Sequence, residues 1–96
     1  RMDLDIGIDY GADSDRAISI VQGLIAADER AHSDPEPFVK VTNLGASSVD
    51  LTLRVWCKRE DLFDLRFDLT RAIKLAFDRE GIGIPYPHLE VIQKQA

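Results

Sequence analysis

Apolar side chains occupy every second position from residue 2 to residue 10, and aspartates or glycine fill the positions between them. This period of two is typical of a strand with one face buried and the other face in water. The same alternation returns over residues 49–57, which predicts a second long strand with Val55 and Cys57 on the buried face.

A shorter strand is predicted over residues 38–44, with Val39 and Val41 on one face. Residues 45–48 read Gly-Ala-Ser-Ser, a composition typical of a tight turn. Because so short a connection joins it to the strand at residues 49–57, the two strands should pair antiparallel as a hairpin.

In two segments, apolar residues recur at helical spacing and not at every second position. After the capping aspartates of residues 13–15, apolar side chains recur three and four positions apart, and we expect this helix to end before Ser33, ahead of two prolines. A second helix is predicted from Asp61 to a stop at Gly81, where a left-handed residue ends many helices. Its apolar stripe comprises Leu62, Leu65, Leu69, Ala72, Ile73, Ala76 and Phe77.

Residues 89–92 have the composition of a last short strand, which makes the predicted order β-α-β-β-α-β. This is the ferredoxin-like pattern, an α+β sandwich in which two helices cover one face of an antiparallel sheet. The length of 96 residues suits one domain, so we treat residues 1–96 as a single unit with a tail at residues 88–96.

Charge narrows the functions that such a domain can have. Twelve lysines and arginines against 17 aspartates and glutamates give a net charge of −5. Nucleic-acid binding draws much of its affinity from neutralised phosphates, so an acidic chain without a basic cluster is a poor candidate for it. The longest apolar run has four residues, from 24 to 27, whereas a membrane-spanning helix needs about 20.

No residue set carries catalytic chemistry. The only two histidines, His32 and His88, are far apart, and no Cys-x-x-Cys motif accompanies them, so no metal site is expected. Cys57 is predicted to face the core, where a thiol is inert. Asp3, Asp5 and Asp9 share one strand face, which we interpret as a solvated face, with an electrostatic surface as the alternative. The sequence therefore predicts neither an enzyme nor a bound cofactor.

Three large aromatic side chains fall outside the predicted core. Phe63 and Phe67 lie off the apolar stripe of the second helix, and Trp56 points away from the core face of its strand. Exposed aromatics of this kind are typical of interfaces. A core that extends further around the helix is the alternative explanation.

Several segments together resemble one family, the small-conductance mechanosensitive (MscS) channels. The two most specific segments are the Leu-Gly-Ala-Ser-Ser turn and the Gly-Ile-x-Ile-Pro-Tyr-Pro sequence after the second helix. The resemblance covers nearly the whole chain in order, and its segments are residues 6–10, 27–30, 43–49, 53–56 and 77–87.

The resemblance implies the cytoplasmic C-terminal α/β domain of a channel subunit in the bacterial inner membrane. In that family, seven subunits build a hollow cytoplasmic cage with side portals, and the pore releases ions and small solutes after hypoosmotic shock. The domain would then serve assembly and form the cage wall, with copies of itself as partners, no nucleic acid, and membrane contact only through an N-terminal part. An isolated fragment would be monomeric if the rest of each interface is missing.

The resemblance also implies roles for particular residues. Asp3 falls where the family often has an acidic residue near the side portals. In the family, the tail after the Pro-Tyr-Pro sequence of residues 85–87 runs toward an axial β-barrel that contains one strand from each subunit. Together with the exposed aromatics, this gives the candidate interface set: Trp56, Phe63, Phe67, Pro85, Tyr86, Pro87, Leu89 and Val91.

A different class of function is also compatible with this pattern. Ferredoxin-like domains can act as free-standing regulatory modules that bind a small ligand, because a fold does not determine its function. That alternative requires a ligand pocket, and a shift in melting temperature with amino acids or nucleotides would support it.

Overall fold

The alternating segments form three strands, β1 (Met2–Ile8), β2 (Phe38–Leu44) and β3 (Val49–Val55), in a computed structural model that describes residues 1–85. Both neighbouring pairs are antiparallel, and the order β1–β3–β2 places β3 in the centre. The α+β class is confirmed, and the strand order is compatible with the ferredoxin-like pattern. The predicted last strand, at residues 89–92, lies outside the described residues.

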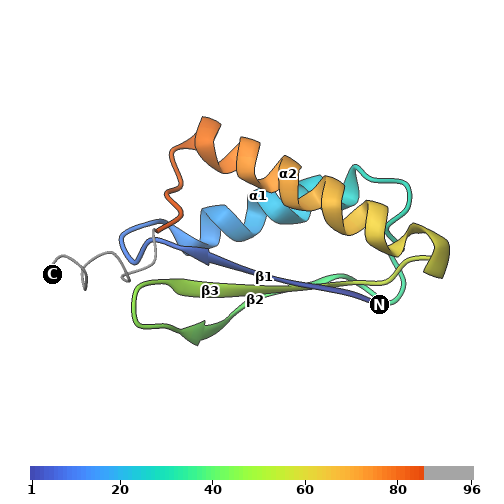
Figure 1. The fold of residues 1–96 in the computed structure, drawn as a ribbon, viewed down its shortest axis with the longest axis horizontal. Coiled ribbons are helices and arrows are strands. Elements are labelled where there is room, and N and C mark those ends of the chain that lie inside the picture. The colour runs from blue at the N-terminus through green and yellow to red at the C-terminus, as the bar shows by residue number, and fades with distance from the viewer. Residues whose placement is uncertain (86–96) are drawn as a thin grey trace, which may run out of the picture.

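The two helical segments form α1 (Ser14–Ala26) and α2 (Leu62–Glu80), and a 3-10 turn, η1 (Arg59–Asp61), leads into the second. Both helices lie on the same side of the sheet, as predicted (Figure 1). Helix α1 contacts β2 and β3, whereas α2 contacts β1. The sheet therefore has one covered face and one face without a helix among residues 1–85.

The predicted capping residue at the start of α1 and the predicted glycine at the end of α2 are both observed. The Asp13 carboxylate accepts a hydrogen bond from the backbone N–H of Arg16 at 3.1 Å, which caps the start of α1. At the end of α2, Gly81 adopts a left-handed conformation with φ 75°, and the Ile82 N–H donates to the Phe77 carbonyl at 2.9 Å. This arrangement is a Schellman motif, and it turns buried Ile82 back onto the core.

Helix α1 ends earlier than the sequence predicted. The predicted end lay just before Ser33, but the last helical residue is Ala26. The Asp28 carboxylate accepts a hydrogen bond from the backbone N–H of Arg30 at 3.0 Å. Because such local side-chain bonds compete with the helical pattern, the chain leaves the helix well before the prolines.

One strand boundary also differs from the prediction. Strand β3 ends at Val55 rather than Cys57, and the Trp56 carbonyl accepts a hydrogen bond from the loop N–H of His32 at 2.8 Å. Val39 and Val41 share one face, as predicted, because they pair in unbroken register with Leu53 and Leu51, although Val41 is 40% exposed on the edge strand. A bulge between Val41 and Asn43 shifts the register only beyond Val41.

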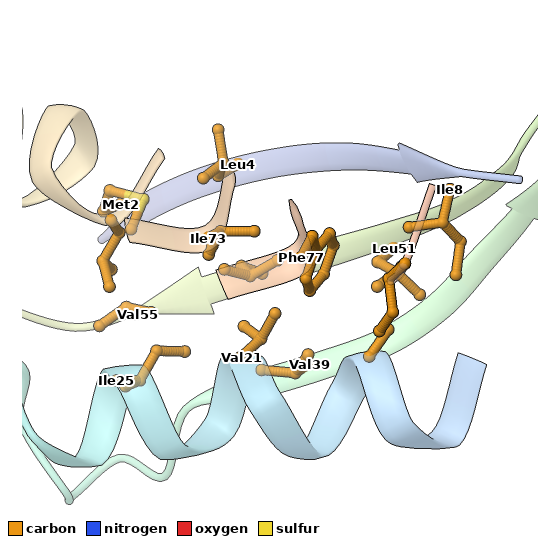
Figure 2. Close-up of a cluster of buried hydrophobic side chains, with 14 of the residues drawn as sticks. Met2, Leu4, Ile8, Val21, Ile25, Val39, Leu51, Val55, Ile73 and Phe77 are labelled. Carbon is orange, nitrogen blue, oxygen red and sulfur yellow. The ribbon is translucent and has the colours of Figure 1, made fainter. Parts of the chain in front are cut away.

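The core lies between the covered face of the sheet and the two helices (Figure 2). Phe77 of α2 is fully buried there, together with Leu51 and Val55 of β3 and Val21 of α1. No buried polar or charged side chain is found within residues 1–85. The described fold is therefore held mainly by apolar burial from one face of each element.

One ion cluster links the loop after α1 to α2. The Arg30 guanidinium lies 2.7 Å from the Asp28 carboxylate and 3.0 Å from the Asp68 carboxylate. The hydrogen bonds from the Arg30 side chain hold the pKa of Asp28 below its ordinary value, and partial burial opposes that shift. The loop that ends α1 early is thus tied to the second helix.

Replacing the central aromatic side chain should destabilise the domain strongly. We expect Phe77→Ala to lower the free energy of unfolding by about 3–5 kcal/mol, because it removes buried surface and leaves a cavity. Denaturant titration followed by circular dichroism measures the loss. The matched control is Phe67→Ala on the same helix, where the side chain is 62% exposed and the change should stay within about 0.5 kcal/mol. Equal losses for the two variants would contradict this description of the core.

The Asp28–Arg30 pair should make stability depend on pH in acid. Since the folded-state pKa of Asp28 is lowered, its contribution is complete above the unfolded pKa of about 4 and is lost as the pH falls through the folded value. Asp28→Asn should therefore reduce the stability difference between pH 7 and pH 3, measured by denaturant titration. The control, Glu29→Gln, removes a neighbouring exposed carboxylate and should leave that difference unchanged. An unaltered difference in Asp28→Asn would contradict the role of this pair.

Candidate functional site

The side chains that most often bind metal ions do not gather at one place in the described part of the chain. Within residues 1–85, no three His, Cys, Asp or Glu side chains lie close enough together to hold a metal ion. Cys57 is half-buried against the core, as predicted, and His32 is exposed on the loop before β2. Over the same residues, no helix has the length and apolar character needed to cross a membrane. The candidate sites are therefore surfaces.

Asp3 lies on β1 beside Arg54 of β3, with its side chain 52% exposed. The Arg1 guanidinium donates two hydrogen bonds to this carboxylate, at 2.8 and 3.0 Å. These bonds hold the pKa of Asp3 below its ordinary value, with further lowering by the charges of Arg1 and Arg54. Asp3 is therefore a fixed negative charge whose field is partly balanced by its arginine neighbours.

Trp56 shares one of those neighbours. Its ring lies 5.9 Å from the Arg1 guanidinium, and the side chain is half-buried outside the main core. Two sequence-predicted candidates, Asp3 and Trp56, thus come together through Arg1 at the start of β1. This proximity was not predicted from the sequence, although the alternation of both strands shows which faces they occupy.

Phe63 and Phe67 are 69% and 62% exposed, so the structure excludes the alternative of a core that extends around α2 to include them. Pro85 is half-buried at the end of the described chain. The remaining members of the candidate interface set lie outside the described residues; they are Tyr86, Pro87, Leu89 and Val91.

The uncovered face of the sheet carries a polar network that the sequence analysis did not identify. The Thr52 hydroxyl donates to the Asp5 carboxylate at 2.8 Å and lies 2.6 Å from the Thr42 hydroxyl, so one chain of polar contacts crosses all three strands. Arg54 stacks over the Phe38 ring at 4.9 Å, and its buried Nε has no hydrogen-bond partner among the described residues. This face is suited to contact with water.

The conspicuous turn between β2 and β3 is held by several local contacts. The Asp50 carboxylate accepts hydrogen bonds from the Ser48 hydroxyl at 2.6 Å and the Asn43 amide at 2.8 Å, and both lower the pKa of Asp50. The Tyr10 hydroxyl donates to the Gly45 carbonyl, so the end of β1 is bonded to the turn. These contacts give the Leu-Gly-Ala-Ser-Ser sequence a structural role.

The segment after α2 meets the same end of the sheet. The Asp9 N–H donates to the Gly83 carbonyl at 2.9 Å. A Cβ atom at position 83 would overlap the exposed Asp9 carboxylate, so glycine lets this side chain keep its position beside the docked segment. Part of the Gly-Ile-x-Ile-Pro-Tyr-Pro sequence therefore serves to dock the chain beside β1.

An open groove of about 750 Å³ lies on the other flank of the domain, between α1 and β2. We call it the edge groove. Its most buried lining residues are Ile25 and Val39, and its rim includes Gln22, Glu36 and Lys40. No local sequence pattern signals this groove, because it is lined jointly by α1, the loop of residues 31–37 and β2.

Comparison with known proteins assigns a family to this fold. The family model described as mechanosensitive ion channel MscS, C-terminal, matches residues 2–84. An uncharacterized MscS family protein of Synechocystis is 41% identical over 91 residues, which are 95% of this chain and 31% of that protein. The small-conductance mechanosensitive channel of Edwardsiella ictaluri is 34% identical over 96 residues, which are 100% of this chain and 34% of that channel.

A solved structure has the same fold. The crystal structure of Helicobacter pylori MscS in its closed state superimposes with a TM-score of 0.84 at 32% identity, covering 92% of this chain and 35% of that one. This chain spans about a third of the length of the relatives it matches. The match over residues 2–84 and the shared fold place the chain in the MscS family of mechanosensitive ion channels, where it corresponds to the C-terminal domain.

Proposed function

We propose that this domain forms part of the cytoplasmic wall of a mechanosensitive channel in the bacterial inner membrane. Seven copies of the subunit would enclose a cage, and the open channel would release ions and small solutes on hypoosmotic shock. The observation that carries the proposal is the match of nearly the whole chain, at a TM-score of 0.84, to one third of the closed-state Helicobacter pylori MscS.

The uncovered face of the sheet is polar, which is compatible with a cage wall that is exposed to water. The uncovered face of the sheet presents Asp3, Asp5, Lys40 and Thr52. Thr52 donates to Asp5, Arg1 donates to Asp3, and the Lys40 ammonium lies over the Phe38 ring, so these groups have partners from the strands and the N-terminal residue. No helix covers this face among residues 1–85, so the domain can stand between two aqueous compartments without burying polar groups. Its contribution to the channel would be a rigid, polar-faced panel and not a catalytic site.

The exposed aromatics are proposed to contribute contacts between subunits. Phe63 and Phe67 would lose their water contact on assembly, which is favourable for large apolar side chains. Trp56 and Pro85, both half-buried, would lie at the margins of such contacts. The same role is proposed for Tyr86, Pro87, Leu89 and Val91, for which the proposal rests on the family resemblance alone.

Asp3 is proposed to contribute to the electrostatic environment of a side portal. Its carboxylate is about half exposed and stays ionised, because Arg1 lowers its pKa. A fixed charge beside a narrow passage biases which ions concentrate there. The partial balance by Arg1 and Arg54 means that the effect of one Asp3 would be modest, and a ring of copies would add their fields.

The channel proposal predicts rescue of osmotically fragile cells. Expression of the complete subunit in bacteria that lack their own mechanosensitive channels should raise the number of colonies that survive hypoosmotic shock. Leu53→Asp should abolish the rescue, because an unpaired carboxylate at this fully buried position unfolds the domain. Colony counts and immunoblots of the membrane fraction measure both effects.

The matched control is Leu44→Asp, the same substitution at a 70% exposed position, and it should rescue like the parent. Failure of the parent subunit to rescue would contradict the channel proposal. In that case, a rise in the melting temperature of the domain with an amino acid or nucleotide would instead support the free-standing ligand-binding module.

The portal proposal predicts a change in ion preference. Asp3→Lys in the complete subunit should shift the reversal potential toward that of anions, measured by patch clamp in a salt gradient, because each copy exchanges a negative charge for a positive one. The control, Asp15→Lys, makes the same charge change at the exposed start of α1 and should leave the reversal potential unchanged. An identical reversal potential in Asp3→Lys and the parent would contradict the portal role.

A further inference from the structure

Strand β2 forms the edge of the sheet on the α1 flank. Within residues 1–85 it pairs only with β3, so its outer edge keeps unpaired backbone N–H and C=O groups. The pairing with β3 is regular from Phe38 to Val41, and the bulge that follows interrupts it. Pro37, just before the strand, has no N–H to donate. The edge therefore offers regular backbone hydrogen bonds only over a short stretch at the start of β2.

The edge groove follows this same stretch of β2. Its lining includes Phe38, Val39 and Lys40 in succession, opposite residues 22, 25 and 26 of α1. Successive side chains of a strand point to opposite faces of the sheet. A run of three consecutive lining residues therefore means that the strand borders the groove with its edge, and not with one face alone. The groove lies where an added strand would pair with β2.

The floor of the edge groove is apolar. Figure 2 shows Val39 of β2 directed toward α1, and Ile25 of α1 lies in the same layer. These two side chains are 5% and 2% exposed at the floor. An extended peptide can pair its backbone with a strand edge and place every second side chain against such a floor. Shape and chemistry together therefore suit an extended chain with alternating apolar residues.

Two opposite charges lie on the rim of the groove. The charged side chains that line it are the carboxylate of Glu36 and the ammonium of Lys40, four residues apart. Neither takes part in an ion pair within residues 1–85. The Lys40 ammonium lies 5.7 Å from the centre of the Phe38 ring, beside the start of β2. A strand that complements this rim carries one acidic and one basic side chain with the same spacing.

We infer that the edge groove binds a short extended peptide of another protein, which adds a strand antiparallel to β2. Antiparallel pairing is the slightly more stable of the two orientations. It places an acidic residue of the peptide opposite Lys40 and a basic residue, four positions later, opposite Glu36. The residues opposite Val39 and Pro37 point to the covered side of the sheet and are apolar. The recognised pattern is acidic, apolar, any, apolar, basic.

A second copy of the chain is the other occupant that the rim charges allow. Residues 36–40 read Glu-Pro-Phe-Val-Lys, so they too have an acidic and a basic residue four positions apart. Two identical edges pair antiparallel around a two-fold axis, whereas a ring of seven copies has no such axis. The proposed channel therefore leaves the groove of each copy to a peptide from another protein. This choice of occupant rests on the proposed function.

The test measures binding of a fluorescein-labelled peptide, Ser-Glu-Val-Thr-Val-Lys-Ser, to the complete subunit purified in detergent. Fluorescence anisotropy should rise along a saturable curve. Exchanging the Glu and the Lys of the peptide should weaken binding about tenfold, because like charges then meet at both ends of the added strand. The exchanged peptide should regain binding with the double variant Glu36→Lys/Lys40→Glu. Equal binding of the two peptides to the parent, or no binding of either, would overturn the inference.

Filling the groove should prevent binding. Ala26 is exposed and lines the groove at the end of α1, so Ala26→Trp should abolish the anisotropy change. The matched control is Ala27→Trp, because Ala27 is also exposed but lies outside the lining, and this variant should bind like the parent. Equal effects of the two substitutions would contradict a site in the groove.

Backbone methylation of the peptide tests for strand pairing. The N–H groups of a strand point alternately toward its partner and away from it. Two peptides are therefore compared, with N-methyl groups on the odd or on the even residues. One should lose binding and the other should keep it. Identical binding of the two methylated peptides would show that no strand is added to β2.

The same assay identifies the other occupants, each of which would overturn the inference. Competition by free glutamate and lysine would assign the groove to small zwitterionic solutes. Binding that appears only after deletion of residues 86–96 would assign it to that segment of the chain. Paired channels in light scattering, separated by Lys40→Glu, would indicate contact between the β2 edges of two copies. Peptide binding by a subunit that fails to rescue cells from hypoosmotic shock would overturn the channel proposal alone.

Discussion

The whole arrangement depends on the burial of one face of the sheet beneath α1 and α2. Phe77 is at the centre of this layer, fully buried among side chains from β3 and both helices (Figure 2). Since no buried polar side chain is found among residues 1–85, the apolar layer is the main determinant of how the helices sit on the strands, and ion pairs such as Arg30–Asp68 add to it at the surface. The exposed side of α2 and the uncovered face of the sheet are positioned by that layer, because each is the opposite side of an element that takes part in it.

Because the helices bury only one face of the sheet, the other surfaces of the domain are available for contact with water or with a partner. The uncovered side of the sheet satisfies its polar groups by cross-strand contacts, such as the one between Thr52 and Asp5. The outer side of α2 keeps two phenylalanines in water, which is unfavourable for an isolated domain. The cost is understandable if these side chains become buried in the assembly proposed above.

Much of the fold was predictable because local signals agree with the tertiary structure. The alternation over residues 2–10 and 49–57 and the glycine at position 81 each correspond to an observed element or cap. The errors occur where a single contact overrides the pattern. The hydrogen bond from Arg30 to Asp28 accompanies an early end of α1, which hydrophobic periodicity does not signal. The bulge between Val41 and Asn43, which shifts the pairing of β2 with β3, is not signalled by periodicity either.

The candidate surfaces differ in how far they could be predicted from the sequence. The exposure of Phe63 and Phe67 follows from helical spacing, which is a property of one segment. The edge groove depends on how the loop of residues 31–37 leaves α1 and meets β2, so it involves three segments whose relative placement no local pattern specifies. The contact of Arg1 with both Asp3 and Trp56 likewise requires the register between β1 and β3.

The order β1–β3–β2 makes the two edges of the sheet chemically different. Because β3 is central, β1 and β2 are the edges, and each lies beneath a different helix: α2 contacts β1, and α1 contacts β2. The surroundings of one edge therefore cannot be deduced from those of the other, and a contact with another molecule through β1 would involve different side chains from a contact through β2.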